Sequence, residues 1–331
     1  MKQDSAGDRL VIHPRVSIII LNWNGSPNTI ECLESVYRMD YPNYDTIVVD
    51  NGSADSSLET IRRYCAGSIS IDLDFLQIRD ENNPIAVLEY KRPEAETVRE
   101  EDKHIANLPN SQKLILIKNE RNCGFPAGNN VGIAYALRVL KPSYVLLLNN
   151  DTVVQRSLLS ELVEIVERQD VGVITPTVCL YDTPMRMQEE ARYRGITRLT
   201  EDTFLSGCCF LVATKVFESI GLLDPDYFLY CEDSDFFMRA KNAGFKVAYY
   251  PTQSCIFHKQ GKSANNISGK KMYYMARSKV MFKKKYPAEV CTYTYVIRDL
   301  GIYLAVALVK SKFDPRIVYY FLKGLIDGAS H

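Results

Sequence analysis

The sequence lacks a net charge, a Cys-x-x-Cys pair and a long apolar run, and each absence excludes a class of protein. Forty basic side chains balance forty acidic ones over 331 residues, so no overall field attracts nucleic acid or an anionic membrane. Nine cysteines without paired spacing are typical of reduced thiols in a cytosolic protein. Met1 to Pro14 is polar, which predicts that the protein is not exported. The apolar run Leu300 to Val309 is too short for a spanning helix and leaves only surface attachment open.

Two common nucleotide-binding motifs are also absent. A dinucleotide site needs G-x-G-x-x-G after the first strand, but the segment from Asn22 to Ser26 has a single glycine. A phosphate-binding loop would need glycine at Ile256, five residues before Gly261-Lys262-Ser263. The sequence therefore disfavours NAD or FAD enzymes and P-loop ATPases.

The first half of the chain repeats one pattern, in which an apolar run is followed by a polar cluster and a helix-period stretch. This alternation predicts an α/β fold, with parallel strands joined by crossover helices. The four expected strands are Val16 to Leu21, Thr46 to Val49, Lys113 to Ile117 and Tyr144 to Leu148. Residues 69–112 are charged and are expected to form an insertion hanging off the sheet, with Leu73 to Ile78 and Ile85 to Tyr90 as further strand candidates. Glycines at 124, 128 and 132 favour close packing of a helix against the sheet.

The second half is rich in tyrosine, phenylalanine and short elements. Phe204 to Val212 is expected to be extended, and Asp233 to Ala243 helical up to Gly244. From Tyr286 onward the pattern is helical and amphipathic. We therefore expect a tail over 1–14, a main domain over 15–285 with halves at 15–151 and 152–285, and a small helical extension over 286–331.

Polar clusters follow all four expected strands, where ligands bind in an open α/β sheet. For any single cluster, ordinary loop composition explains the residues about as well as function does. Four clusters at one edge favour a binding site. Trp23, the only tryptophan, is expected to be partly buried in the core rather than stacked on a base. The clusters are Asn22-Trp23-Asn24, Asp50-Asn51-Gly52, Asn119 to Asn122 and Asn149-Asn150-Asp151.

An ordered set of motifs gives the chain a family resemblance. The segments are Val16 to Asn24, Val48 to Ser53, Asn122 to Asn130, Leu148 to Asp151, Gly207, Gly221 to Asp224, and Tyr230 to Asp235. Together, over roughly residues 16–258, they resemble the family 2 inverting glycosyltransferases of GT-A fold, and the rhamnosyltransferase-like branch fits best. The resemblance implies a cytoplasmic enzyme of polysaccharide or cell-surface glycan synthesis. It would move a sugar from a UDP- or dTDP-sugar, with dTDP-rhamnose among the candidates, to a saccharide or lipid-linked acceptor.

The resemblance also implies a metal site. Mg²⁺ or Mn²⁺ would neutralise the charge that develops on the leaving diphosphate, and Asp151 at a strand end is the expected ligand. His258, which alone would be read as a hydrogen-bonded loop histidine, becomes a second contact to the metal or diphosphate. Asn149 occupies the first position of the family's D-x-D, where an aspartate is frequent. Its amide lowers the negative charge of the site.

An inverting displacement needs a carboxylate to remove the acceptor hydroxyl proton. The family pattern makes Asp233 this base, with Glu232 and Asp235 shaping acceptor binding or local hydrogen bonds. Acidic residues at a helix start also stabilise the helix dipole, which explains one acid better than three. Arg239 is spaced as an ion-pair partner of Asp235.

The nucleotide side rests on other residues. Asp50 is expected, by resemblance, to accept a hydrogen bond from the imide of uracil or thymine. Asn22, Asn24 and Asn129 would line the same pocket, and the Asn149 oxygen could contact the metal or the ribose.

Partners follow from this interpretation: a nucleotide sugar and a glycan or lipid-linked acceptor, and no nucleic acid. The sequence leaves open whether the protein forms a homodimer. The basic run Phe282 to Tyr286 and the apolar run after it leave peripheral membrane contact open, although packing of the extension on its own domain or on a subunit is favoured. Two alternatives also remain. A catalytically silent sugar-nucleotide-binding scaffold is supported only by Asn149, and a sugar nucleotidyltransferase would need a glycine- and arginine-rich loop after the first strand.

Overall fold

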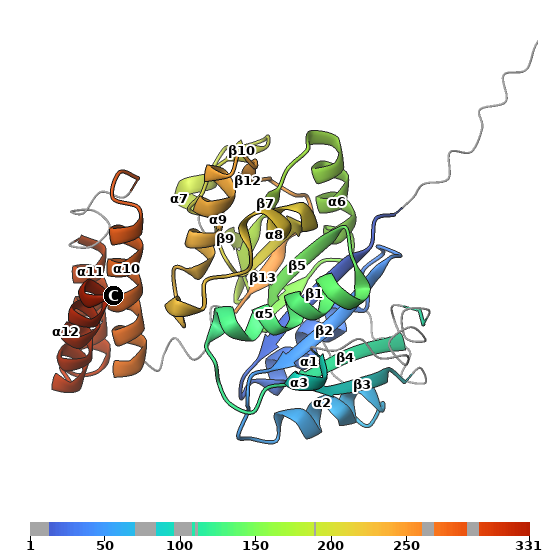
Figure 1. Ribbon diagram of the computed structural model, residues 1–331, viewed down its shortest axis with the longest axis horizontal. Coiled ribbons are helices and arrows are strands. Elements are labelled where there is room, and N and C mark those ends of the chain that lie inside the picture. Colours follow the sequence, from blue (N-terminus) through green and yellow to red (C-terminus); the bar gives the residue numbers. More distant parts are fainter. Residues whose placement is uncertain are drawn as a thin grey trace, which may run out of the picture.

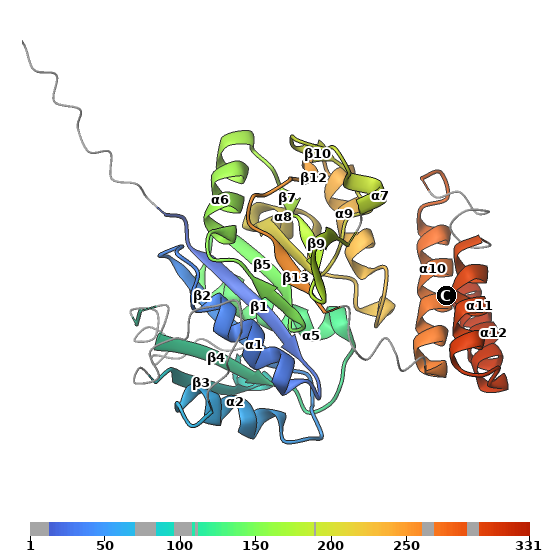
Figure 2. The ribbon, with the colours of Figure 1, turned by 180° about the vertical axis from the view of Figure 1, so that it is seen from behind.

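The computed structural model describes residues 13–69, 84–95, 108–109, 112–188, 190–259, 268–289 and 298–331. Two sheets, flanking helices and three C-terminal helices make up this part of the chain (Figures 1 and 2). The strands are β1 (Val16–Asn22), β2 (Tyr44–Asp50), β3 (Ala86–Lys91), β4 (Lys113–Lys118), β5 (Tyr144–Asn149), β6 (Thr152–Val154), β7 (Val173–Thr175), β8 (Val178–Leu180), β9 (Thr183–Met187), β10 (Thr200–Glu201), β11 (Cys209–Ala213), β12 (Val247–Tyr249) and β13 (Ile256–His258). The helices are α1 (Ser26–Val36), α2 (Ser57–Cys65), α3 (Arg92–Ala95), α5 (Phe125–Tyr135), η2 (Ala136–Leu140), α6 (Leu158–Gln169), α7 (Glu190–Tyr193), α8 (Thr214–Ile220), η3 (Pro225–Tyr227), α9 (Glu232–Asn242), α10 (Gly269–Lys285), α11 (Asp299–Lys310) and α12 (Pro315–Ser330).

The large sheet has nine strands in the order β10-β12-β7-β11-β5-β1-β2-β4-β3. β1 pairs in parallel with β2 and β5, and β4 pairs in parallel with β2 and β3. β11 runs antiparallel between β5 and β7. The expected α/β class with a mostly parallel sheet is therefore confirmed, and the four expected strands are β1, β2, β4 and β5.

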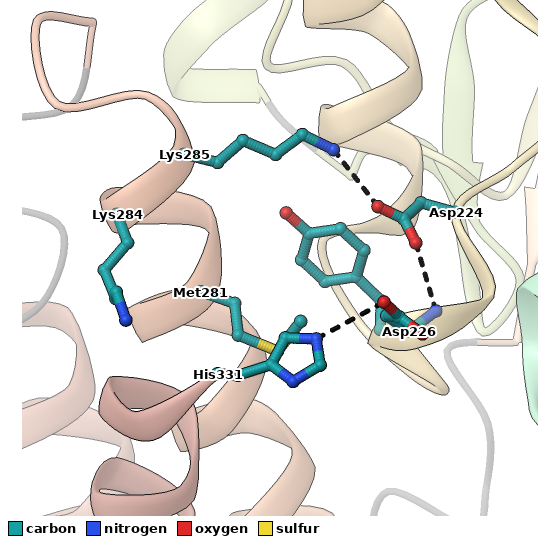
Figure 3. Close-up of a pocket in the computed structure, with 7 residues that line it drawn as sticks. Asp224, Asp226, Met281, Lys284, Lys285 and His331 are labelled. Atoms are coloured by element: carbon teal, nitrogen blue, oxygen red, sulfur yellow. Dashed lines mark hydrogen bonds and ion pairs between the residues drawn. The ribbon is translucent and has the colours of Figure 1, made fainter.

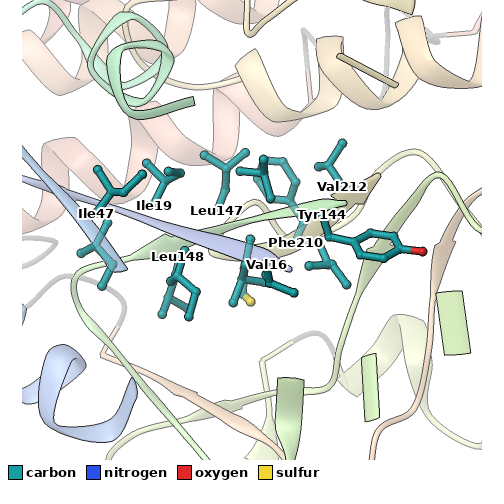
Figure 4. Packing of buried hydrophobic residues seen from close by; sticks show 14 of the residues in the cluster. Val16, Ile19, Ile47, Tyr144, Leu147, Leu148, Phe210 and Val212 are labelled. Carbon is teal, nitrogen blue, oxygen red and sulfur yellow. The ribbon is translucent and has the colours of Figure 1, made fainter. Parts of the chain in front are cut away.

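Helices cover both faces of the sheet, so its central strands are almost continuously apolar and buried. α5 lies on the opposite face from α1 (Figures 1 and 2). The expected close packing at the α5 glycines is confirmed, because a Cβ at Gly132 would lie 2.8 Å from Ile19 Cγ2. Figure 4 shows side chains of β1, β2, β5 and β11 interleaved in this core, among them Ile19, Ile47, Leu147 and Phe210.

The expected insertion over 69–112 differs in its described part. Ala86–Lys91 is an edge strand of the large sheet, paired residue by residue with β4, and does not hang off it. Burial of Tyr90 beside Tyr135 anchors this edge. Leu73 to Ile78, the other expected strand, lies outside the described residues.

The second half places two functional segments beside the strand ends. β11 begins at Cys209, so Phe204 to Cys208 precedes the strand and the expected extended run is shorter than predicted. A small sheet in the order β6-β13-β8-β9 carries His258 at the end of β13, which pairs with β6 just after Asp151. The turn after β5 and the end of β13 are thereby joined.

The three C-terminal helices pack on one another and on the main body. Gly324 and Gly328 of α12 lie so close to α10 that a Cβ would overlap the carbonyl oxygens of Tyr273 and Arg277. α10 contacts the body through Phe282, which packs in a buried cluster with Tyr227 of η3. In the described part of the chain, none of the helices combines the length and apolar character needed to span a bilayer.

A cavity of about 280 Å³ remains between η3 and helices α10 and α12 (Figure 3). Its acidic groups are paired: Lys285 Nζ lies 3.1 Å from Asp224 Oδ2, and His331 Nε2 lies 3.3 Å from Asp226 Oδ2. These pairs fasten α10 and the end of α12 to η3.

Candidate active site

A larger cleft of about 580 Å³ opens at the carboxyl ends of the parallel strands. One side is formed by residues that follow β1, β2, β4 and β5, as expected for an open α/β sheet. The other side is formed by the segment after η3 and by the first turns of α10. The lining residues are Leu21, Trp23, Asn51, Asn122, Gly124, Phe125, Asn149, Asn150, Asp151, Phe228, Leu229, Ser268, Lys270, Lys271 and Tyr274.

Asp50 is the centre of a hydrogen-bond network at the ends of β1 and β2. It is fully buried and accepts from Asn22 Nδ2 at 2.8 Å and from Ser53 Oγ at 2.6 Å. Asn24 joins the network, because its backbone N–H donates to Ser53 Oγ at 2.9 Å and its Oδ1 accepts from Ala54 N. Three of the expected nucleotide residues therefore hold one another in place.

The turn after β5 connects this network to the cleft. Asn150 Nδ2 donates to Thr29 Oγ1 at 3.0 Å, and Thr29 Oγ1 donates to Asn22 Oδ1 at 2.8 Å. Asn149 and Asp151, on either side of Asn150, line the cleft. Asn129 does not share this network: it is buried in α5, and its Nδ2 donates to Phe125 O at 2.9 Å.

Asp151 and His258 face each other across the paired strand ends. His258 Nε2 lies 3.3 Å from Asp151 Oδ1, and both side chains are mostly buried. Burial alone would lower the pKa of His258, but its hydrogen bonds to Asp151 and Cys208 outweigh burial and raise the pKa to about 10. Gln188 Oε1 lies 2.7 Å from His258 Nδ1, so a proton on Nδ1 donates to Gln188 and directs the Nε2 nitrogen at Asp151.

A carboxylate oxygen and an imidazole nitrogen at this separation suit a divalent cation such as Mn²⁺, and the hydrogen bond from His258 Nδ1 to Gln188 Oε1 resembles the support that metal-binding histidines receive. No group of three or more His, Cys, Asp or Glu side chains gathers as a metal site in the described ranges. Mg²⁺ is commonly held by two protein ligands, and its remaining ligands are phosphate oxygens and water. Asp151 and His258 therefore fit the metal that the sequence implied.

Asp233 lies at the start of α9, with its carboxylate against Gly207. A Cβ at Gly207 would overlap Asp233 Oδ2, and the backbone N–H of Gly207 donates to this carboxylate. The N–H of Ser234 donates to Asp233 Oδ1 at 2.7 Å. Burial nevertheless raises the pKa of Asp233.

Glu232 is buried beside Asp233, and its Oε2 has no hydrogen-bond partner among the described residues. Burial, and then the charge of Asp233, raise the pKa of Glu232 to about 8. Two adjacent buried carboxyl groups do not ionise independently, so they titrate as a pair. The pair is poised to hold a proton near neutral pH.

Asp235, the third acid of α9, is used to attach α10. Its fully buried carboxylate lies 2.7 Å from Arg239 Nε and 2.7 Å from Lys285 Nζ. The expected ion pair with Arg239 is confirmed. Tyr286 Oη also donates to Asp235 Oδ1 at 3.0 Å. Both oxygens of the Asp235 carboxylate are therefore occupied by ion pairs and hydrogen bonds within the fold.

Cys208 and Gly207 connect the two halves of the site. The Asn149 N–H donates to Cys208 O at 2.9 Å, and the Cys208 side chain is hydrogen-bonded to His258. Gly207 contacts Asp233. A continuous chain of contacts therefore runs from Asp50 through the turn after β5 to His258 and Asp233.

Several cleft residues were not identified from the sequence. Trp23 is 54% exposed on the cleft, so the expectation of partial core burial is wrong. The chain leaves the sheet after Asn22, so the ring of Trp23 lies at the cleft and not in the core. Lys270, Lys271 and Tyr274 come from α10. Only the two lysines could have been noticed in the sequence, because they are cations without an acidic neighbour along the chain.

The segment between η3 and α9 forms the wall that faces Tyr274. Phe228, Tyr230 and Cys231 have positive φ angles of 60°, 71° and 67°, which are unfavourable for these residue types. Two hydrogen bonds hold the segment: Phe125 N donates to Phe228 O at 2.7 Å, and Ser278 Oγ donates to Leu229 O at 2.8 Å. Phe228 also stacks on Tyr274, with ring centroids 4.4 Å apart.

Two family models match the chain. Residues 17–84 match the family described as "Glycosyl transferase family 2", and residues 91–273 match "Glycosyltransferase like family 2". The chain is 27% identical over 140 residues to the low-salt glycan biosynthesis hexosyltransferase Agl10 of Haloferax volcanii, covering 38% of this chain and 46% of that protein. It is 25% identical over 162 residues to the rhamnosyltransferase WbbL of Escherichia coli, covering 41% of this chain and 61% of that protein.

The chain thus spans about half the length of the curated relatives it matches. Among solved structures, it is similar to the mannosyltransferase PcManGT from Pyrobaculum calidifontis in complex with GDP-Man and Mn²⁺, with a TM-score of 0.56, 15% identity, and coverage of 97% of this chain and 87% of that one. It is also similar to residues 1–349 of S. aureus TarS in complex with UDP-GlcNAc, with a TM-score of 0.54, 14% identity, and coverage of 94% and 81%. These two similarities concern the fold.

Proposed function

Because the chain belongs to glycosyltransferase family 2, we propose that this glycosyltransferase of GT-A fold moves a sugar from a UDP- or dTDP-sugar to a saccharide or lipid-linked acceptor, with inversion at the anomeric carbon. The rhamnosyltransferase and hexosyltransferase relatives support dTDP-rhamnose as a donor to test. The observation that carries the proposal is the chain of contacts that joins Asp50, Asp151, His258 and Asp233 at one strand edge.

In this proposal the nucleotide lies against the ends of β1 and β2, where Asp50, Asn22 and Asn24 fix the local geometry. Asn149 and Asp151 lie beside the diphosphate. Asp151 and His258 would hold Mg²⁺ or Mn²⁺, and the bound cation would supply positive charge to stabilise the leaving diphosphate. Lys270 and Lys271, on the opposite wall of the cleft, add fixed positive charge toward the same substrate.

Asp233 is the proposed general base. Its carboxylate is held by the N–H groups of Gly207 and Ser234, which set its position without neutralising it. Burial raises its pKa, and a more basic carboxylate is better suited to removing a hydroxyl proton. Glu232 is proposed to modulate this basicity as its titration partner.

A thermal-shift panel tests the donor assignment. UDP-sugars and dTDP-sugars, each with and without Mn²⁺, are expected to raise the melting temperature only for the correct base and sugar, because a ligand that binds the folded state stabilises it. The stabilised donor then enters a transfer assay with saccharide and lipid-linked acceptors. Stabilisation by no nucleotide sugar, with or without metal, would contradict the proposed function.

Gly207→Ala is expected to lower kcat about 10²-fold while the fold is retained. The added Cβ would overlap Asp233 Oδ2, so the carboxylate must move from its position. Gly301→Ala is the matched control, because a Cβ at Gly301 meets nothing within 4 Å. The measurements are kcat and the melting temperature of both variants. Equal kcat for Gly207→Ala and wild type would show that the position of Asp233 does not matter.

The pH dependence of transfer should show the raised pKa of the base. Burial moves the pKa of Asp233 above its usual value of 3.8, and a base works only when ionised. Activity is therefore low below the raised pKa and increases as the pH passes it. The test is kcat/KM from alkaline pH down to the usual carboxyl value of 3.8. A rate that stays level down to that value would exclude a base with a raised pKa.

A further inference from the structure

Helices α11 and α12 are apolar on two sides. Their inner side packs on α10: Leu300 and Ala307 of α11 join Ile317 and Phe321 of α12 in a buried cluster with Met272. A helix that is apolar all round normally has a second apolar environment. In both views α10 lies between the main body and α11 and α12, so the body does not provide it (Figures 1 and 2).

The outer side of these helices concentrates the exposed apolar side chains of the described residues. Among the six residues named at the end of this paragraph, exposure ranges from 46% at Val306 to 66% at Val309. Spacings of three and four residues place the side chains in one stripe along each helix. Soluble proteins seldom expose apolar surface of this extent without a partner. We call the following residues the apolar face: Ile302, Val306, Val309, Tyr319, Leu322 and Ile326.

Three lysines accompany the apolar face. Lys310, Lys312 and Lys323 are exposed on the same two helices and their connecting loop. The acidic residues of this part of the chain are Asp299, Asp314 and Asp327; Asp314 pairs with Arg316 at 2.7 Å, and Asp327 Oδ2 accepts a hydrogen bond from Tyr273 Oη of α10 at 2.7 Å. A second copy of the chain would bring the same lysines into the interface. A surface of opposite charge is therefore the better complement.

We propose that the apolar face, with its surrounding lysines, docks on an anionic lipid bilayer. The two helices would lie in the plane of the interface with apolar side chains among the acyl chains and lysines at the headgroups. Neither helix is able to span a bilayer, which suits a peripheral contact. In this arrangement α10, which packs on α12 and supplies Lys270 and Lys271 to the cleft, lies between the docked helices and the main body (Figure 1).

Vesicle flotation of the full chain tests the proposal independently of any transfer reaction. The vesicles contain phosphatidylcholine alone or with about 30% phosphatidylglycerol, and wild type is expected to bind the anionic vesicles at least about tenfold more tightly. Val309→Ser with Ile326→Ser removes apolar area without changing charge, and should weaken binding about tenfold or more.

A charge-matched pair of double variants separates local from overall electrostatics. Lys310→Gln with Lys323→Gln should weaken binding to anionic vesicles about tenfold or more, because each lysine near the surface contributes to attraction. Arg156→Gln with Lys241→Gln removes the same charge from exposed positions on the body, and its binding should match wild type.

Three results would overturn the proposal. Wild type could fail to bind anionic vesicles. Alternatively, the two double variants on the C-terminal helices could bind as well as the control variant and wild type do. Sedimentation could also show a dimer that Val309→Ser with Ile326→Ser converts to monomer, which would make the apolar face an interface between copies of the chain.

Discussion

Asp233→Asn is expected to lower kcat for sugar transfer by about 10²- to 10⁴-fold, the range that a general base contributes. Asparagine has nearly the shape of aspartate and keeps an oxygen for the N–H groups of Gly207 and Ser234, but it cannot accept the acceptor proton. Donor affinity should remain unchanged, because Asp233 lies at the start of α9 and not with the residues proposed for the nucleotide. The measurements are kcat and the thermal shift produced by the donor.

Asp226→Asn is the matched control. Asp226 undergoes the same chemical change, but it lies in the smaller cavity beside His331 and outside the cleft (Figure 3). Its kcat should equal that of wild type. If Asp233→Asn turns over at the wild-type rate, another group removes the proton. If it loses donor binding as well as turnover, its role is structural.

Removal of divalent metal is expected to abolish transfer, with recovery on addition of Mn²⁺ or Mg²⁺. Asp151→Asn should lower kcat by about 10²-fold or more, because it replaces the only carboxylate of the candidate metal pair by a neutral amide. The neighbouring Asn149 is already neutral, so the variant would leave the turn after β5 without any charge. The activity is measured over a titration of Mn²⁺ after chelation.

A second readout does not depend on turnover. Mn²⁺ should increase the thermal shift that the donor produces in wild type, and this increase should disappear in Asp151→Asn. Asp170→Asn, a change at an exposed aspartate that pairs with Lys215, is the control and should retain the increase. Full activity in chelator would assign Asp151 to a contact with ribose or phosphate instead of metal.

The part of the site that could be predicted from the sequence is the part built on strand ends. β1, β2, β4 and β5 are short, strongly apolar runs buried on both faces, and a polar residue directly after each one can lie only at the sheet edge. Asn22, Asp50, Asn149 and Asp151 were placed correctly along the chain for this reason.

Nonlocal pairing explains what the sequence could not predict. β3 combines exposed and partly buried residues with a single buried one, Tyr90, so nothing in the run itself shows that it joins the sheet through β4. α10 begins after residues 260–267, which lie outside the described structure, and its cleft residues are separated from the strand ends by more than a hundred positions. Gln188, which contacts His258, belongs to a turn with no motif of its own.

Because Phe228 stacks on Tyr274, helix α10 forms part of the cleft wall. The backbone at Phe228, Tyr230 and Cys231 has unfavourable positive φ angles, and Ser278 Oγ of α10 donates to the carbonyls of Tyr227 and Leu229. Exchange of these helices for another module would therefore reshape this wall of the cleft unless the replacement kept an aromatic ring at 274 and a hydroxyl at 278. The shape of this wall, and with it any selectivity of the cleft for an acceptor, depends on two stretches that are far apart in the chain.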